Sequence, residues 1–357
     1  MNSNKNTSMK NILAAVCILC LFMVSGNLSA QDAHFSQFNT TPLQINPAQT
    51  GVFDGTFRLS NNYRTQWSGL GKGYSTIHVA ADAPLGKGKL GTNFFGVGLL
   101  IYQDKAGSAG FSNTVIEASA SYVAAMDNDA NHYFAIGFQA GLNQMGLDLS
   151  KTTWDSQWNG DAFDPTLPSQ DLVQLEQFTY LDFNGGVLYY YVPDGINSIS
   201  LGASIAHIGS PNVSFYARQE TPLRSKISVH GSSEISLTSE NITWINPRFL
   251  VSLQGKQKEI IVGALVKNKI QIKSEYTKYK KEAFFSLGAL YRVQDALILA
   301  TRFDYYKFGL GISYDINTSG LRKLTGSASA WEFNLSFITP VLRGRKEQNF
   351  NKMPKFL

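Results

Sequence analysis

Beyond residue 30 this sequence contains no cysteine, because Cys17 and Cys20 both precede that point. Without a thiol, the remaining chain can form neither a disulfide framework nor a zinc site built on cysteine. The five histidines show no metal-binding spacing such as H-E-x-x-H, and no serine, histidine and acid spacing indicates a hydrolase. We therefore expect no enzyme activity, no metal and no cofactor.

Residues 1–30 have the pattern of a cleaved export signal. Two lysines give a basic start, 12–24 form a short apolar run, and small residues precede Gln31. The apolar run is too short and wrongly flanked for a transmembrane helix. We expect cleavage between Ala30 and Gln31, and the lack of a cysteine at that point argues against a lipid anchor.

Long apolar runs and a strong net charge are also lacking. No later window offers the roughly 18 consecutive apolar residues that suggest a membrane-spanning helix. The whole chain has 31 Lys and Arg against 26 Asp and Glu, and two of the lysines belong to the leader. The exported part is therefore only weakly basic, which together with export argues against nucleic acid as a partner.

Basic residues gather at the end of the chain, in a predicted periplasmic tail formed by 341–357. Arg343, Arg345 and Lys346 lie in this tail, where basic residues outnumber acids. Such a tail is either a solvated end or a docking segment for an acidic or peptidoglycan-side partner.

From Gly55 onward, apolar and polar residues alternate. Phe57 and Tyr63 fall on one face of an extended chain, whereas Arg58 and Arg64 fall on the other. Turn residues separate most of these alternating segments. We count about 14: 55–67, 72–83, 92–103, 110–124, 131–143, 178–192, 197–208, 225–237, 242–254, 257–267, 283–293, 296–306, 307–316 and 329–340.

Two all-β architectures fit this alternation, a soluble sandwich and a membrane barrel. The barrel is favoured by export, by polar faces of Gly, Ser, Asn and isolated charges that suit a lumen, and by aromatic residues near strand ends that suit interfacial girdles. The fold we predict is therefore an all-β, transmembrane antiparallel β-barrel of about 14 strands over 55–340. The girdle candidates are Tyr63, Trp67, Tyr102, Tyr122, Tyr189, Tyr191, Tyr291, Tyr305, Tyr314 and Trp331.

The longest break between strands is 144–177, and a loop of this length in a barrel is usually functional or extracellular. Trp154, Trp158 and Phe163 are residue types found at the energetic centres of protein interfaces. They either bind a partner or pack within the loop. The stretch 155–161 resembles the start of a calcium loop, but Thr166 stands where the bidentate glutamate is required.

The glycine-rich stretch "GKGKLG" at 86–91 matches a dinucleotide-binding pattern. No helix follows it, and the pyrophosphate needs a helix N-terminus. We therefore interpret it as a hairpin turn.

The start of the exported chain, "QDAHFSQFNTTPLQINPAQTGVFDGTFRLSNNYRTQW" at 31–67, resembles the PorP/SprF family. Further similarity lies in 158–169, 295–317 and 353–357, so it extends over the exported chain. One departure is that the tail lacks the cysteine that many members carry before their terminal proline. The matching residues at the start are Gln31, Asp32, Phe35, Ser36, Gln37, Phe38, Asn46, Pro47, Ala48, Gly51, Phe53, Gly55, Tyr63, Arg64, Gln66 and Trp67.

This resemblance implies an outer-membrane barrel of the type IX secretion and gliding apparatus of Bacteroidota. It further implies support for secretion or surface anchoring of a large, adhesin-like client protein that carries a C-terminal sorting domain. A periplasmic ring lipoprotein and a peptidoglycan-binding lipoprotein are possible further partners.

Residues 31–54 precede the first strand and are expected to act as a plug or gate, or to form an ordered lead-in on the periplasmic rim. Non-helical backbone survives at membrane depth only where protein or water surrounds it. Pro42 and Pro47 are expected to keep the path extended and turned, and Asn46 to hydrogen-bond the local backbone. Phe35 and Phe38 can pack on inward-facing side chains.

Two functional classes remain open from the sequence. One is a barrel that holds a protein partner, with candidate contacts in the N-terminal motif, the loop and the tail. The other is a small-solute porin or transporter, which the modest charge of the polar faces weakly disfavours.

Overall fold

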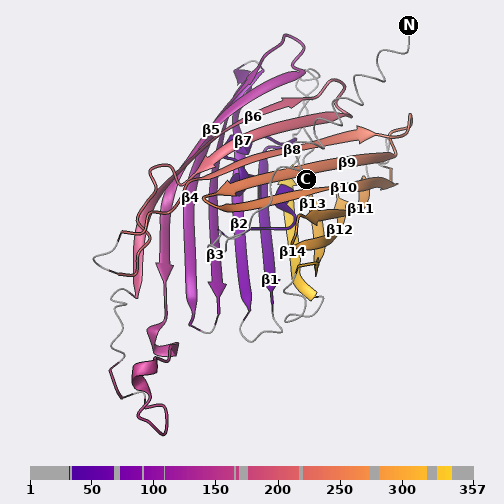
Figure 1. Ribbon diagram of the computed structural model, residues 1–357. Helices are drawn as coiled ribbons and strands as arrows, with labels where there is room; N and C mark the ends of the chain where they lie inside the picture. Colours follow the sequence, from indigo (N-terminus) through magenta and orange to yellow (C-terminus); the bar gives the residue numbers. More distant parts are fainter. Residues whose placement is uncertain are drawn as a thin grey trace.

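The computed structural model describes residues 32, 34–67, 73–90, 92–107, 109–164, 166–168, 176–216, 220–272, 281–319 and 328–339. In this part of the chain, fourteen antiparallel strands close into a barrel in which each strand pairs with its neighbours in sequence and β1 pairs with β14 (Figure 1). Among these described residues, no helix is long and apolar enough to cross a membrane.

Short helical turns precede the first strand, and two more lie between β5 and β6. They are η1 (Phe38–Thr40), α2 (Pro42–Ile45), η2 (Pro47–Gln49), η3 (Leu149–Lys151) and η4 (Asp155–Gln157). The strands are β1 (Phe57–Gln66), β2 (Tyr74–Leu90), β3 (Asn93–Ala106), β4 (Phe111–Ala125), β5 (His132–Gly146), β6 (Gln177–Tyr191), β7 (Ser198–Ala206), β8 (Lys226–Ser236), β9 (Thr243–Gln254), β10 (Gln257–Gln271), β11 (Ala283–Arg292), β12 (Ala296–Tyr305), β13 (Phe308–Asn317) and β14 (Ala328–Thr339).

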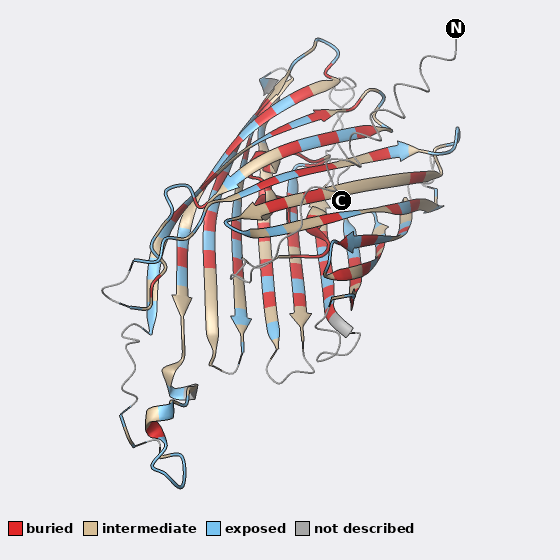
Figure 2. Ribbon diagram, viewed as in Figure 1, coloured by how far each residue is buried: buried red, intermediate tan, exposed pale blue. Residues whose placement is uncertain are grey.

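Every predicted strand is present. Along the strands polar side chains face the lumen and apolar side chains face outward, as in a membrane barrel. On β1, Arg58 and Arg64 are buried at 2% and 1% exposure, whereas Phe57 and Tyr63 are each 40% exposed. The same alternation of buried and exposed positions follows many of the strands (Figure 2). Polar side chains inside and apolar side chains outside suit a wall that faces lipid. The structure therefore excludes the soluble sandwich.

Two local expectations were wrong. The stretch 86–91 is not a simple hairpin turn, because β2 continues to Leu90 through a shift of register between Leu85 and Leu90. Gly86 has φ +75°, a conformation that glycine adopts without a steric penalty and that is common at β-bulges. Tyr102 is no girdle residue, because its side chain is buried in the barrel.

The two ends of the barrel differ in the length of their connections. One end, the short-turn end, carries the turns 126–131 and 192–197 as well as the start of β1 and the end of β14. The other, the long-loop end, carries 147–176 and 207–225. The loop between β5 and β6 projects well beyond the barrel, at the lower left of Figure 1. In bacterial barrels short turns face the periplasm, so we assign the long-loop end to the cell exterior.

Candidate functional site

Residues 34–55, which we call the N-terminal segment, lie among inward-facing side chains from opposite walls of the barrel. Phe38 packs in an apolar cluster with residues of β9 to β12, whereas Leu43 packs in another with residues of β2, β3 and β4. Phe35 makes an edge-to-face contact with His78 at 5.6 Å. The segment therefore crosses the lumen, surrounded by protein, as non-helical backbone at membrane depth requires.

The sequence predicts that the two prolines keep the segment extended and turned. The turns are present, but the extended path is not. Pro42 begins α2 and Pro47 begins η2. Proline is favoured at the first position of a helical turn, because its fixed φ suits the helix and its missing N–H would have no partner there. The segment is thus a series of short turns that fits a narrow space.

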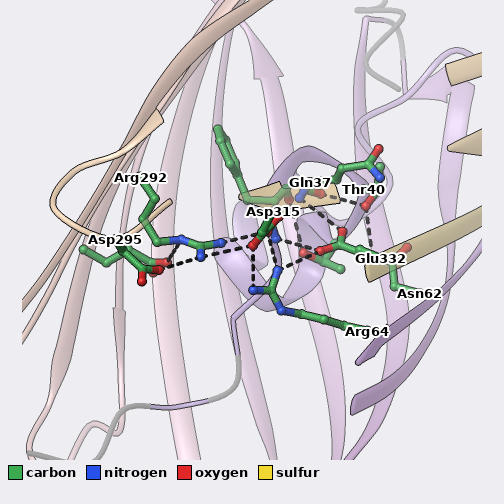
Figure 3. A network of polar contacts seen from close by, with 12 residues as sticks. Gln37, Thr40, Asn62, Arg64, Arg292, Asp295, Asp315 and Glu332 are labelled. Carbon is green, nitrogen blue, oxygen red and sulfur yellow. Dashed lines mark hydrogen bonds and ion pairs between the residues drawn. The ribbon is translucent and has the colours of Figure 1, made fainter. Parts of the chain in front are cut away.

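A network of buried charges surrounds Ser36 near the long-loop end, and Figure 3 shows its members Arg64, Arg292, Asp315 and Glu332. The Ser36 amide donates to Glu332 at 2.7 Å, and its hydroxyl lies 2.7 and 2.8 Å from the carboxylate oxygens of Asp315. Arg64 bridges the two acids, at 2.9 Å from Asp315 and 3.2 Å from Glu332. Arg292 donates to Ser36 at 2.8 Å. Strands β1, β11, β13 and β14 thus converge on one residue of the segment.

A second charged cluster lies ahead of the segment, at the point where β7 ends. His207 contacts Asp182 of β6 at 2.6 Å and Asp32 at 2.9 Å, and Lys226 lies 3.5 Å from Asp32. Burial opposes protonation of His207, but the two carboxylates outweigh it and raise the pKa of this residue to about 10. Burial alone would raise the pKa of Asp32, yet Lys226 and His207 hold it well below its usual range. At neutral pH this contact is therefore ionic.

Asn46 is at the centre of the segment and is fully buried. Its side-chain oxygen accepts from the Ala48 amide at 2.9 Å, so the predicted local hydrogen bond is confirmed. Its amide group donates outward, to the backbone oxygen of Val187 at 2.9 Å, and lies 3.1 Å from Nε2 of His230. One asparagine therefore shapes its own turn and ties that turn to β6 and β8.

The end of the segment is fixed through Asp82 on β2. This carboxylate accepts from the Gly51 amide at 2.7 Å and forms a bidentate pair with Arg58 at 2.7 and 2.8 Å. Arg58 also lies over the ring of Phe53 at 4.7 Å. Gly51 has φ +74°, and a Cβ there would lie 2.8 Å from Gly96 Cα. Only glycine fits this turn without strain.

Glycines on the wall allow the segment to approach it closely. A Cβ on Gly137 would lie 2.2 Å from the backbone nitrogen of Ala48, and one on Gly96 would lie 2.0 Å from the oxygen of Thr50. A Cβ on Gly186 would lie 2.0 Å from the side-chain oxygen of Asn46. A pocket lined in part by Phe38, Pro42 and Ile45 is small, about 10 Å³, which leaves room for about one water molecule. A second small pocket, of about 20 Å³, lies ahead of the segment at Asp32 and Lys226.

The structure brings only some of the candidate residues together. Six lie in the lumen, while Tyr63 faces outward and Trp67 packs edge-on against Tyr74 at 5.0 Å, beside the long-loop end. Arg343, Arg345 and Lys346 lie outside the described residues. The six in the lumen are Phe35, Phe38, Asn46, Pro47, Gly51 and Arg64.

The three aromatic candidates of the loop are only partly buried within it. Trp158 and Phe163 are 59% and 41% exposed and form a bridge of backbone to one another. Trp154 is half-buried, and Gln157 holds the turn by donating to the oxygen of Leu167 at 3.0 Å. The loop thus presents aromatic rings beyond the barrel.

The acids that hold the segment were missed by sequence reasoning. The alternation predicts only isolated charges on the polar faces, yet Asp82, Asp315 and Glu332 each contact an arginine or a backbone amide of the segment. The available signal was the number of acids and arginines at lumen-facing positions. The contact between Ser36 and Glu332 joins residues nearly 300 positions apart, which a local pattern does not reveal.

Comparison with protein families now decides the relationship. A family model described as "Type IX secretion system membrane protein PorP/SprF" matches residues 27–337. The chain belongs to this PorP/SprF family. The resemblance is thereby confirmed over most of the chain. The family is one of type IX secretion membrane proteins, and together with the barrel fold it places the chain in the outer membrane.

Solved structures offer only distant similarity to this PorP/SprF barrel, and no curated protein sequence matches it. The toluene transporter TodX of Pseudomonas putida has 9% identity over 83% of this chain and 92% of its own, with TM-score 0.46. The toluene transporter TbuX of Ralstonia pickettii has 10% identity over 83% and 92%, with TM-score 0.43. BamA of Haemophilus ducreyi has 11% identity over 80% and 70%, with TM-score 0.43.

Proposed function

We propose that this protein is a closed outer-membrane barrel of the type IX secretion apparatus that holds a large secreted client at its outer face. The observation that carries this proposal is the filled lumen. A barrel whose interior is occupied by its own chain offers partners its two ends rather than an open channel. The family and the barrel architecture point to a non-enzymatic role.

The N-terminal segment acts as a plug in this proposal. Support comes from its contacts with strands around the barrel and from the smallness of the neighbouring pockets. The contacts include hydrogen bonds from Ser36 and Gly51 to buried carboxylates, and a hydrogen bond to a charged group contributes about 1.5–3 kcal/mol. A plug held in this way stays closed unless a partner offers compensating interactions.

The loop 147–176 is the proposed client contact. Its exposed Trp158 and Phe163 have the chemistry of interface centres, and the loop between β5 and β6 projects from the end that we assign to the exterior (Figure 1). The basic tail, with Arg343, Arg345 and Lys346, is proposed to contact periplasmic ring or peptidoglycan-binding components. The client is a secreted protein with a C-terminal sorting domain, adhesin-like in size.

A pull-down in mild detergent from native outer membranes, followed by mass spectrometry, tests this proposal. We expect one large secreted protein to copurify with the tagged barrel. The double variant Trp158→Ala and Phe163→Ala should reduce its recovery at least tenfold, whereas truncation after residue 340 should instead remove periplasmic components. A matched control, Ile208→Ala, removes an exposed apolar side chain from the neighbouring loop.

The alternative is a small-solute porin or transporter. The same preparation, reconstituted in liposomes, distinguishes it by the rate of solute entry. Recovery of the barrel without any client, together with rapid solute entry, would overturn the client-holding proposal and favour the porin.

A further inference from the structure

The outer face of the barrel has an apolar hollow of about 840 Å³ on strands β3 to β8. Its rim is formed by outward-facing side chains that are all at least 38% exposed. They are Phe95, Tyr122, Ile136, Phe138, Val187 and Ile205. The hollow is therefore separate from the lumen and opens toward lipid.

Three small outward-facing residues create this hollow. Ala120 on β4, Gly185 on β6 and Ala203 on β7 form its floor together with the backbone beneath them. In the register of the sheet Gly185 lies between Phe138 on one side and Ile205 on the other, so one side chain is missing from an otherwise continuous apolar row. The result is a slot bordered by an aromatic and a branched aliphatic side chain.

The same patch of wall carries the N-terminal segment on its inner face. Gly186 and Gly137, whose missing Cβ atoms would clash with Asn46 and Ala48, line the hollow through their backbone. The wall is thus one backbone layer thick, with the segment on one side and the hollow on the other. An empty hollow would leave this layer without packing partners outside, which forfeits dispersion contacts.

We propose that the hollow binds the acyl chain of a phospholipid from the surrounding bilayer. The exposed apolar belt of the barrel continues around the rim, so the occupant comes from the membrane. The lining offers no charged side chain, as a hydrocarbon chain requires. Tyr189 lies two residues beyond Val187, about 7 Å nearer the short-turn end, and its hydroxyl is 2.8 Å from Nδ1 of His132. A polar aromatic tip at that level suits the headgroup region.

Selective binding over bulk lipid must come from packing, because lipid chains are as apolar as the wall. A chain in the slot contacts the wall on several sides, whereas a chain on the convex wall contacts it on one. We therefore expect a lipid in the hollow to exchange more slowly than its neighbours. This inference does not depend on the identity of any client.

The test is photolabelling of the full-length barrel in vesicles of phosphatidylcholine and phosphatidylethanolamine that contain a phosphatidylcholine with a diazirine on its acyl chain. Peptide mass spectrometry should find adducts on the hollow at least fivefold above those on Leu287, Leu299 and Leu310. These leucines face lipid on β11, β12 and β13. Adducts in proportion to exposed area would overturn the proposal.

Gly185→Leu supplies the decisive variant. A Cβ at Gly185 would meet its nearest atoms at ordinary distances, 3.6 Å and 3.9 Å, so the side chain can occupy the slot without disturbing the wall. Labelling of the hollow should fall to the level of the leucine patch. Ala289→Leu, which enlarges an outward-facing residue of β11, is the matched control and should change nothing in the hollow.

Ala203→Leu narrows the same slot from β7. If the Gly185→Leu barrel assembles poorly, photolabelling of this second variant tests the same prediction. Undiminished labelling of the hollow in either assembled variant would overturn the proposal. Crosslinks from the hollow to a copurified protein, instead of lipid, would do so as well.

Discussion

The two ends of the N-terminal segment are held to the barrel by different physics. Near the long-loop end, Ser36 is fixed by Arg64, Arg292, Asp315 and Glu332. At the other end, backbone around Ala48 lies directly against glycines of the wall. The first end is held through charged side chains, whereas the second is held by close packing of backbone, with one charged contact between Asp82 and the Gly51 amide.

This difference determines how each end can be released. The hydrogen bonds between Ser36 and the buried charges are strong, but a competing charged group or a change of protonation can replace them. A partner cannot replace the close packing of the segment's backbone against the wall glycines, because no other group fits between the two backbones. We infer that a partner acting from outside loosens the charged end first, while the glycine end stays in place.

The largest effect is expected from Gly137→Val on β5. Its Cβ would lie 2.2 Å from the Ala48 nitrogen and 2.3 Å from the Pro47 carbonyl carbon, and backbone atoms cannot move aside alone. Overpacking of this kind costs about 1–3 kcal/mol or more, and displacement also breaks the contacts of Asn46. We expect ion conductance in planar bilayers where the parent barrel has little. The control is Gly185→Ala, on the outward face. If the Gly137→Val barrel showed no added conductance and kept the parent's free energy of unfolding, close packing at this glycine would not be what holds the segment.

A smaller effect on conductance, but a clear one on stability, is expected from Arg64→Met at the charged end. The change leaves Glu332 without its arginine and Asp315 with only Arg292, and an uncompensated buried charge costs about 3–5 kcal/mol. The free energy of unfolding in detergent, measured with denaturant, should fall by this amount while conductance stays low. In the double variant with Glu332→Gln part of the loss should return. Additive losses would show that the two residues do not act as a pair.

Asn46→Ala tests the link between the two ends and should cost less. The variant loses the hydrogen bonds to the Ala48 amide and to the Val187 oxygen. It also removes the contact of 3.1 Å between the Asn46 amide nitrogen and Nε2 of His230. Each unsatisfied buried group costs about 1–3 kcal/mol. Amide hydrogen exchange at Ala48 should accelerate at least tenfold, with little change at Ser36. Equal acceleration at both positions would mean that the segment moves as one unit.

The sequence was sufficient for the barrel because lipid on one face and polar lumen on the other force a period of two on every strand. It also revealed that Asn46 would cap its own turn, since that contact spans two residues. It could not pair Ser36 with Glu332, a contact set by closure of the barrel rather than by neighbours in the chain. Glycines inside strands, such as Gly137, were the neglected signal, because they mark sites where another backbone approaches closely.

The smallest expected effect concerns His207, at the outermost charged contact. Its pKa is raised to about 10, so the stabilisation is complete below its unfolded value near 6.5 and is lost as the pH rises through about 10. Unfolding free energy should therefore fall between about pH 6.5 and 10, by about 1–3 kcal/mol, the size of a charged hydrogen bond. Because Lys226 also contacts Asp32, the variant His207→Gln is needed as the reference. A flatter profile in this variant would assign the loss to His207, whereas the same slope in both proteins would show that the charged end is insensitive to this histidine.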